Sequence, residues 1–292
     1  MMARQSYSDW LKQLYGTRVQ KLNVNAGFTC PNRDGTFGWG GCTYCNNASF
    51  TPSYSRASSS VTQQLLDGKC FYSGKYASMK YLAYFQSFTG TYAPVERLLE
   101  IYNEALEVPD VMGLVVSTRP DCMNDEILDC LQEIDKRRKV IVELGVETVH
   151  DHTLQLINRC HSWQCAHDAI VAVSGLGFSV GAHLILGLPG ESEIDMMATV
   201  EAVAQLPLSS IKFHQLQVLK GTKLAQLWVR GEVDIIDWTP QQYASLCKQL
   251  LQRLPERIVV ERMVSTAPES LLLYPKWKLK PAQFQQIFEN IL

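Results

Sequence analysis

The sequence has no long apolar run. No stretch approaches the roughly 20 consecutive apolar residues of a membrane-spanning helix, and the first ten residues lack the apolar core of a secretion signal. These absences predict a soluble protein of the cytoplasm without a membrane partner. Internal repeats and low-complexity segments are also missing, the nearest being the serine-rich stretch 53–60.

An excess of charge of either sign is missing too. The 292 residues carry a formal net charge of −2, so the chain as a whole does not attract nucleic acid, although local basic patches remain available. A hydrophobic content of 46% lets a chain of this length bury one large core, or one core and a small appendage.

The nine cysteines form no regular disulfide framework, and their number is odd. Three of them, Cys30, Cys42 and Cys45, cluster in one glycine-rich stretch that follows an apolar, strand-like segment. Clustered thiols in a chain without an export signal indicate a metal site. Three thiolates are one ligand short of a closed zinc site or a fully ligated iron–sulfur cluster, so one metal position stays open. An open position indicates catalysis.

Another interpretation of these cysteines comes from a different class of protein. They could belong to a non-catalytic zinc or iron–sulfur module. A zinc site would need a fourth ligand, yet neither histidine nor another cysteine occurs between Cys45 and Cys70. Three free surface thiols would be a chemical liability, because exposed thiols react readily. A catalytic metal site is therefore the favoured interpretation.

Strand-like and helical patterns alternate along the chain. Amphipathic helical patterns occur, for example, at 95–106 and 127–134, and Asn124 and Thr239 are placed to cap helices. Six βα units in series predict an α/β fold whose parallel sheet closes fully or partly into a barrel, with its chemistry at the carboxyl ends of the strands. The apolar or β-branched runs that predict the strands are 19–28, 79–88, 112–118, 140–147, 178–186 and 211–219.

The cysteine triplet, with Tyr44 just before the last cysteine, resembles the motif of the radical S-adenosylmethionine (SAM) superfamily. The eleven residues between Cys30 and Cys42 resemble its YhcC-like branch, which is related to the barrel of the Elongator catalytic subunit. The resemblance implies a partial (β/α)6 TIM-like barrel. It divides the chain into an N-terminal extension (1–18), the core barrel (19–254) and a small C-terminal α/β extension that caps the barrel (255–292).

The resemblance also implies cofactors and a partner. A [4Fe–4S] cluster would be held by Cys30, Cys42 and Cys45, and its open iron would bind SAM. An electron donor such as flavodoxin or ferredoxin would reduce the cluster, and SAM would then yield a radical that takes a hydrogen atom from a substrate.

Residues at the ends of other strands resemble the SAM pocket of this family. Gln86 and Ser87 lie in a loop that binds the methionine amino group in the family. Glu147 stands where the family's Gly-Val-Gln motif commonly has glutamine, and its carboxylate can accept both ribose hydroxyls. Arg159 is expected to bind the SAM carboxylate as a fork. The remaining expected contacts are Tyr44 and Gly187 near the adenine and His183 near the ribose, with a core histidine as the other interpretation of His183.

The resemblance favours an enzyme that modifies RNA, with a wobble uridine of tRNA as the expected substrate and a small metabolite as the alternative. Basic and aromatic residues that could contact RNA occur near the N-terminus, at 136–139 and at 276–280. The third group is expected to surround the barrel mouth through Lys276, Trp277, Lys278 and Lys280.

Polar groups on the sixth strand and the other cysteines complete the set of candidates. Cys130 and Cys247 lie on apolar helical stripes and are expected in the core, whereas Cys160 and Cys165 stay candidates for redox or substrate chemistry. The candidates for substrate contact are His214, Gln215, Gln217 and Lys220.

Overall fold

The computed structural model describes residues 4–74 and 79–291. Its strands are β1 (Val19–Val24), β2 (Lys80–Phe85), β3 (Val111–Thr118), β4 (Val140–Glu147), β5 (Ser179–Leu186), β6 (Ser210–Gln215), β7 (Val218–Leu219), β8 (Val259–Arg262) and β9 (Leu272–Tyr274). Its α-helices are α1 (Tyr7–Tyr15), α2 (Val61–Tyr72), α3 (Val95–Glu107), α4 (Asp125–Asp135), α5 (Asp151–Leu156), α6 (Trp163–Gly175), α7 (Glu193–Ala204), α8 (Lys223–Val229), α9 (Pro240–Arg253) and α10 (Pro281–Asn290). Two short 3₁₀ helices are η1 (Asn47–Ser49) and η2 (Pro120–Cys122).

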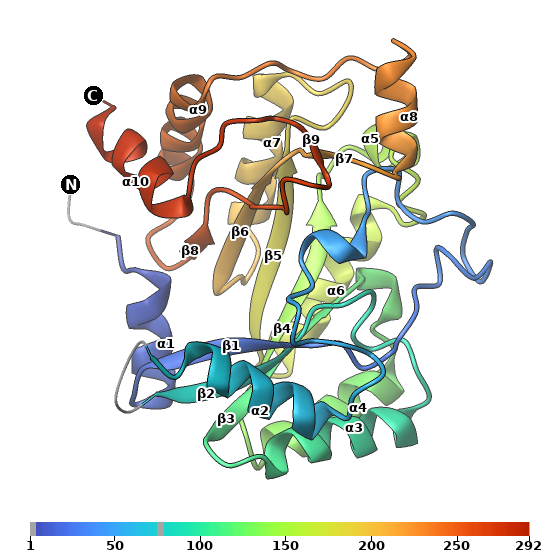
Figure 1. The fold of residues 1–292 in the computed structure, drawn as a ribbon, viewed down its shortest axis with the longest axis vertical. Coiled ribbons are helices and arrows are strands. Elements are labelled where there is room, and N and C mark those ends of the chain that lie inside the picture. Colours follow the sequence, from blue (N-terminus) through green and yellow to red (C-terminus); the bar gives the residue numbers. More distant parts are fainter. Residues whose placement is uncertain (1–3, 75–78, 292) are drawn as a thin grey trace.

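The large sheet contains seven parallel strands in the order β1-β2-β3-β4-β5-β6-β8. It curls into a partial barrel, and helices that connect successive strands lie outside it (Figure 1). The sequence-based prediction of an α/β partial barrel is therefore confirmed. In the described part of the chain, no helix has the length and apolar character needed to cross a membrane.

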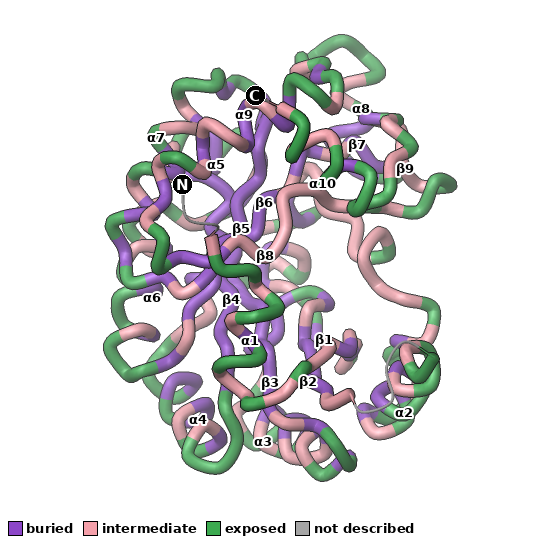
Figure 2. The backbone as a smooth tube through the Cα atoms, turned by 90° about the vertical axis from the view of Figure 1, so that its left-hand side faces the viewer, coloured by how far each residue is buried: buried purple, intermediate pink, exposed green. Residues whose placement is uncertain are grey.

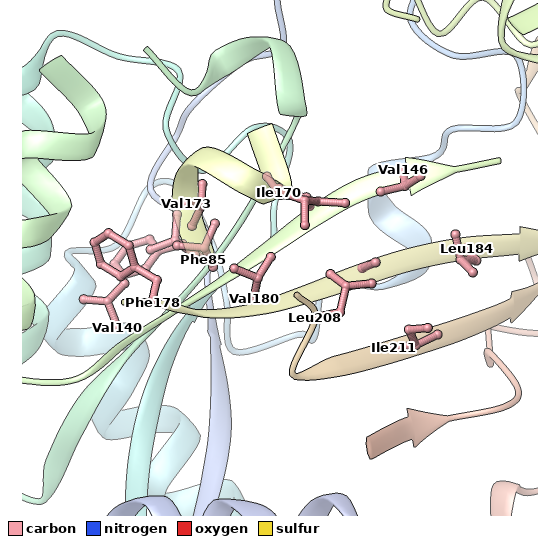
Figure 3. Close-up of a cluster of buried hydrophobic side chains, with 14 of the residues drawn as sticks. Phe85, Val140, Val146, Ile170, Val173, Phe178, Val180, Leu184, Leu208 and Ile211 are labelled. Carbon is pink, nitrogen blue, oxygen red and sulfur yellow. The ribbon is translucent and has the colours of Figure 1, made fainter. Parts of the chain in front are cut away.

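The central strands are mainly apolar because both of their faces are covered. Every residue of β4 is buried, as is typical of parallel strands packed between helices and a filled interior. Figure 2 shows strands β3 to β6 as the most deeply buried part of the molecule. Figure 3 shows Val140 and Val180 of these strands near Ile170 and Val173 of α6 in one cluster of buried apolar side chains.

The helix ends follow the sequence signals. The Asn124 side chain accepts a hydrogen bond from the backbone N–H of Ile127 at the start of α4 (3.0 Å). Thr239 caps α9 in a capping box with Gln242, and Pro240 takes the first helical position. Both predicted caps are confirmed.

The sixth predicted strand is divided. β6 ends at Gln215, whose side chain accepts from the Ser265 backbone N–H (2.6 Å) and donates to the Ser265 carbonyl (2.7 Å). These bonds draw the C-terminal segment to the end of β6. The chain then continues as β7, which pairs antiparallel with β9. The run 257–264 contains β8, which extends the parallel sheet beside β6.

The N-terminal segment lies across the open side of the barrel, between the first and last strands of the sheet. Ser6 forms a parallel bridge with Val260 of β8, and α1 packs on both β1 and β8. The Arg4 guanidinium holds this segment in place by donating to four carbonyls around the end of α9, at distances of 2.7 to 3.1 Å: those of Leu251, Leu254, Pro255 and Ile258.

The C-terminal helix packs on α9 through an aromatic cluster. The Trp277 ring stacks on Phe284 at an interplanar angle of 8°, and its Nε1 donates to the Trp238 carbonyl (2.9 Å). Trp277 is half-buried and packs against the core, and its expected part in RNA binding stays a prediction. Lys276, Lys278 and Lys280 are exposed.

Candidate active site

The cysteine loop is clamped to the segment that follows α5. Asn158 adopts a left-handed backbone conformation (φ 55°), which asparagine tolerates better than most residues. Its Nδ2 donates to the carbonyls of Trp39 (3.1 Å) and Gly41 (2.9 Å). In return, the Asn32 Nδ2 donates to the Asn158 carbonyl at 2.5 Å. Two asparagine side chains thus hold the loop against the barrel.

Two guanidinium groups lie beside the thiols. Arg159 Nη1 is 3.5 Å from Cys42 Sγ, and Arg33 Nη2 donates to the Cys45 carbonyl (3.1 Å). Burial raises the pKa of the Cys45 thiol, Cys42 raises it further, and Arg33 opposes both effects. Neighbouring cations favour the thiolate, which is the form that binds metal.

The three thiols line one pocket of about 210 Å³ at the carboxyl ends of the strands. The three thiols do not converge tightly on a point that would suit a single metal ion. The described residues contain no other group of three cysteine, histidine or acidic side chains that does so. Five of the expected SAM contacts line the same pocket: Tyr44, Gln86, Glu147, Arg159 and His183.

Two of the expected SAM contacts lie elsewhere. The Ser87 side chain is buried and does not line the pocket. Gly187 lines a separate small cavity, and its φ of 86° lets the backbone pass close to the Trp238 ring, which a Cβ would approach to 2.8 Å. Any influence of Gly187 on the pocket would therefore be indirect, through the turn that follows β5.

Arg159 is held by contacts that leave one edge of its guanidinium free. Nη2 donates to the Gly145 carbonyl (2.6 Å) and lies 3.3 Å from a Glu147 carboxylate oxygen. Burial lowers the pKa of Arg159, but Tyr44, Cys42 and Glu147 outweigh it, so the pKa is raised well above its usual value. A Cβ at position 145 would lie 2.4 Å from Nη2, which explains the glycine.

Several buried polar atoms of the pocket have no hydrogen-bond partner among the described residues. A buried donor without a partner is costly, so such atoms point to a missing polar ligand. The residues therefore fit ligands that carry anionic and hydrogen-bonding groups. SAM and a cysteine-bound cluster are ligands of this kind. The atoms are Thr89 Oγ1, Arg119 Nη1, Arg159 Nε and Arg262 Nε.

Arg119 was missed by the sequence analysis. It follows β3 directly, donates to both Asp121 carboxylate oxygens (2.8 and 2.6 Å) and also donates to the Arg159 carbonyl (2.7 Å). The rule applied to the other strands, that polar residues after a strand end face the site, would have found it.

A network of charged side chains continues from the pocket into the barrel. The Glu143 carboxylate of β4 accepts from Lys21 Nζ (2.5 Å), Lys212 Nζ (2.9 Å) and Tyr84 OH (2.7 Å). Burial raises the pKa of Glu143, but the two lysines outweigh it and lower the pKa well below its usual value. Sequence reasoning missed these residues, although charged side chains inside apolar strands were a signal.

His183 lies where this network meets the pocket. Its Nε2 is 2.8 Å from a Glu143 oxygen, and burial lowers the pKa of the imidazole, with Lys212 lowering it further. Because the carboxylate can only accept, Nε2 carries the proton. The ring also lines the pocket.

Only some of the residues expected to contact the substrate line the pocket. His214, Gln215 and Gln217 line the pocket, whereas Lys220 is exposed and accepts a bond from Asn46 through its carbonyl (2.9 Å). The basic group 136–139 joins α4 to β4 and therefore lies at the amino ends of the strands, opposite the pocket. The group 136–139 therefore lies away from the barrel mouth.

The cysteines outside the loop differ in burial. Cys130 and Cys247 are buried in the core, as predicted. Cys160 is exposed, with a φ of 63°, and its Sγ lies 2.9 Å from Asn32 Oδ1 beside the cysteine loop. Cys165 lies half-buried on α6.

Comparison with protein families agrees with this geometry. The Radical SAM superfamily model matches residues 30–203, more than half of the chain, and the Radical_SAM C-terminal domain model matches residues 208–291. The chain belongs to the radical SAM superfamily. It is therefore a radical SAM enzyme, and this family implies a [4Fe–4S] cluster and SAM as cofactors.

Similar proteins include members of the expected branch. The chain is 37% identical to the uncharacterized protein YtqA of Bacillus subtilis over 92% of its own length and 83% of YtqA. It is also 37% identical to protein YhcC of Escherichia coli, over 91% of its length and 85% of YhcC. A tRNA uridine(34) acetyltransferase of Methanocaldococcus infernus is 30% identical, but only over 41% of this chain and 23% of that protein.

Solved structures share the fold of this radical SAM enzyme. The archaeal Elp3 of Methanocaldococcus infernus superposes with a TM-score of 0.67 at 17% identity, covering 93% of this chain and 62% of that one. The coproporphyrinogen III oxidase HemN of Escherichia coli superposes with a TM-score of 0.54 at 16% identity, covering 80% and 52%.

Proposed function

We propose that Cys30, Cys42 and Cys45 hold a [4Fe–4S] cluster and that SAM binds beside it. The observation that carries this proposal is the meeting of three thiols with the unpaired guanidinium atoms of Arg119 and Arg159 in one pocket. Bound there, the reduced cluster and SAM would supply a 5′-deoxyadenosyl radical that takes a hydrogen atom from the substrate.

The chain's own residues would bind and orient SAM. The free Nε edge of Arg159 would donate to the SAM carboxylate, which keeps the guanidinium paired on both sides. Gln86 and the unpaired Thr89 hydroxyl would accept from the amino group. Glu147 would accept from the ribose hydroxyls, while Tyr44 would pack near the adenine.

We further propose that the substrate is a tRNA nucleoside, a wobble uridine. The support is the partial likeness to a tRNA uridine(34) acetyltransferase and the three exposed lysines that follow β9. An electron donor such as flavodoxin or ferredoxin would serve as the redox partner. All nine cysteines are free, as expected of a protein in the reducing cytoplasm.

Mass spectrometry of tRNA nucleosides tests this substrate. We expect cells that lack the protein to lose or change one modified uridine. Wild type and Cys130→Ala should restore it, whereas Cys45→Ala should not, because only Cys45 lies in the pocket. An unaltered set of nucleosides in the deletion strain would leave a small metabolite as the substrate.

A further inference from the structure

Arg262 lies at the wall between two cavities. It lines the cysteine pocket and also a second cavity of about 1490 Å³ between the N-terminal segment, β8 and α10. Of the residues that line both cavities, Arg262 is the charged one. The others are Ser49, Phe50, Gln86 and Thr266.

A β-bulge directs Arg262 to this wall. Along β8, Val260 pairs with Ile211, but the next residue of β6, Lys212, pairs with Arg262, so that Glu261 is left over. A bulge of this kind changes the direction of side chains and is frequent beside active sites. Both residues at the bulge, Glu261 and Arg262, line the second cavity, as do their neighbours Val260 and Met263.

The Arg262 guanidinium has no acidic partner in the described parts of the chain. Its Nη2 lies 3.0 Å from His214 Nδ1, which therefore accepts, and its Nε is buried without a partner. Burial and then Arg262 itself hold the pKa of His214 well below its usual value, so the imidazole is neutral. The Ser265 hydroxyl, 2.7 Å from the same Nδ1, is also uncharged.

The nearest carboxylates are already paired. Glu261 lies 2.7 Å from Lys21 Nζ and 3.1 Å from Lys212 Nζ, and Glu143 bonds the same two lysines. The network therefore holds three cations and two carboxylates, and the cation left over is Arg262. A half-buried guanidinium whose buried Nε has no hydrogen-bond partner and no counter-charge is unfavourable unless a ligand provides one.

We propose that Arg262 binds an anionic oxygen group of the substrate, a carboxylate or a phosphate, at the wall between the two cavities. The fork of donors on a guanidinium matches either group. The second cavity would then hold the body of the substrate, with its reacting end in the cysteine pocket. This inference rests on the proposed function in that the bound molecule is the substrate of the radical SAM site.

Calorimetry on the anaerobically reconstituted, oxidised holoprotein tests the site. Saturating SAM is present in the main series, so that the cofactor's own carboxylate is already placed. Three pairs of probes differ only in an anionic group: uridine 5′-monophosphate against uridine, 5-carboxyuridine against 5-carbamoyluridine, and succinate against succinamide. The variants are Arg262→Gln, Arg262→Lys, and Arg97→Gln as an exposed control on α3.

We expect the wild type to prefer the anion in at least one pair by about 30-fold or more, the loss expected when a desolvated charge pair loses one partner. Arg262→Gln should abolish the preference, Arg262→Lys should retain part of it, and Arg97→Gln should leave it unchanged. Equal binding within every pair, or a preference that survives Arg262→Gln, would overturn the proposal.

The pair that shows the preference identifies the source of the anion. Preference for uridine 5′-monophosphate indicates a nucleotide phosphate, and preference for 5-carboxyuridine indicates a carboxylate on the base. An Arg262-dependent preference for succinate alone would uphold the anion site and remove the RNA substrate. A parallel series without SAM completes the test: an anion preference that appears there and is absent from the series with SAM would assign Arg262 to the cofactor and overturn the proposal.

Discussion

At the scale of single residues, the site depends on two neighbouring side chains, one that binds the cysteine loop and one that lines the pocket. Asn158 holds the backbone of the cysteine loop, while the next residue, Arg159, reaches the Cys42 thiol. The Asn-Arg pair therefore couples the cysteine loop to the barrel. Gly145 makes room for the guanidinium that completes this arrangement.

Replacement of the loop cysteines tests the metal site. We expect Cys30→Ala, Cys42→Ala and Cys45→Ala each to abolish the [4Fe–4S] cluster, because each removes one of three protein ligands. Cys130→Ala and Cys247→Ala should keep the iron, since both thiols are buried in the core away from the pocket. Iron and sulfide analysis after anaerobic reconstitution measures this, and loss of iron in either core variant would refute the ligand assignment.

Replacement of Arg159 and of the glycine beside it tests the SAM contact. Arg159→Ala should weaken SAM binding by roughly 2–5 kcal/mol, because truncation leaves the SAM carboxylate without its partner. Gly145→Ala should weaken binding in the same direction, since its Cβ would lie 2.4 Å from Nη2. Gly175→Ala is the matched control, because its Cβ would meet nothing within 4 Å. SAM titrations that show unchanged affinity for Arg159→Ala would remove this residue from the site.

At the scale of secondary-structure elements, the strands carry two kinds of residue. Their apolar side chains build the core, while a few charged ones, on β1, β4, β6 and β8, pair inside the barrel. The bulge in β8 and the early end of β6 direct the C-terminal residues toward this network. The charged network and residues that line the cysteine pocket therefore come from the same strands.

Glu143 should be a major determinant of stability. Glu143→Gln leaves Lys21 and Lys212 with Glu261 alone, and breaking a buried ion pair in this way typically costs about 3–5 kcal/mol. Glu201→Gln, which removes the partner of Arg253 on the surface of α7, should cost about 1 kcal/mol or less. Urea unfolding of both variants measures the difference, and equal costs would contradict a buried network.

The same carboxylate predicts how stability changes with pH. The folded-state pKa of Glu143 is depressed, so its contribution is complete above the unfolded pKa of about 4.3 and is lost as pH falls through the folded pKa. We expect the free energy of unfolding to fall with acidification below about pH 4–5, and to fall less steeply in Glu143→Gln. Parallel acid titrations would show whether the two slopes differ.

At the scale of the whole molecule, both ends of the chain close around the barrel. The N-terminal segment crosses the open side, and the segment after β8 returns to pair with β7 beside the mouth (Figure 1). Through this return, the exposed Lys276, Lys278 and Lys280 follow a strand that pairs with β7, and β7 comes just after the carboxyl end of β6. The basic group 136–139 lies at the opposite ends of the strands.

Charge reversal on the two sides tests the path of RNA. Replacing Lys276, Lys278 and Lys280 with glutamate should weaken tRNA binding and reduce the dependence of log K on log salt by roughly 2–3, because each phosphate contact releases counterions. The matched control replaces Lys136, Arg137 and Arg138 with glutamate and should leave the salt dependence unchanged. Filter binding at several salt concentrations, with SAM affinity as a check of folding, measures both. A control that weakens binding as much as the first variant would argue against RNA at the mouth.

The sequence by itself determined the architecture and indicated a metal site in the cysteine loop. Apolar runs alternating with amphipathic helical patterns require a parallel sheet with helices outside, because that is how such segments bury their apolar faces. Three cysteines among glycines indicated a metal site independently of the rest of the chain, because this signal lies within one short stretch of sequence. The likeness of Glu147 and Arg159 to a family motif placed both in the pocket that they line.

The tertiary structure alone decided which polar residues meet. Lys21, Glu143, Lys212 and Glu261 come from four strands, and their pairing depends on the register of the sheet. The position of Arg262 depends on a bulge, and the half-buried position of the Trp277 ring depends on its contact with Phe284. Such contacts join residues far apart in the chain, so the side chains that face one another are set by packing and by the closing of the barrel, which no local pattern specifies.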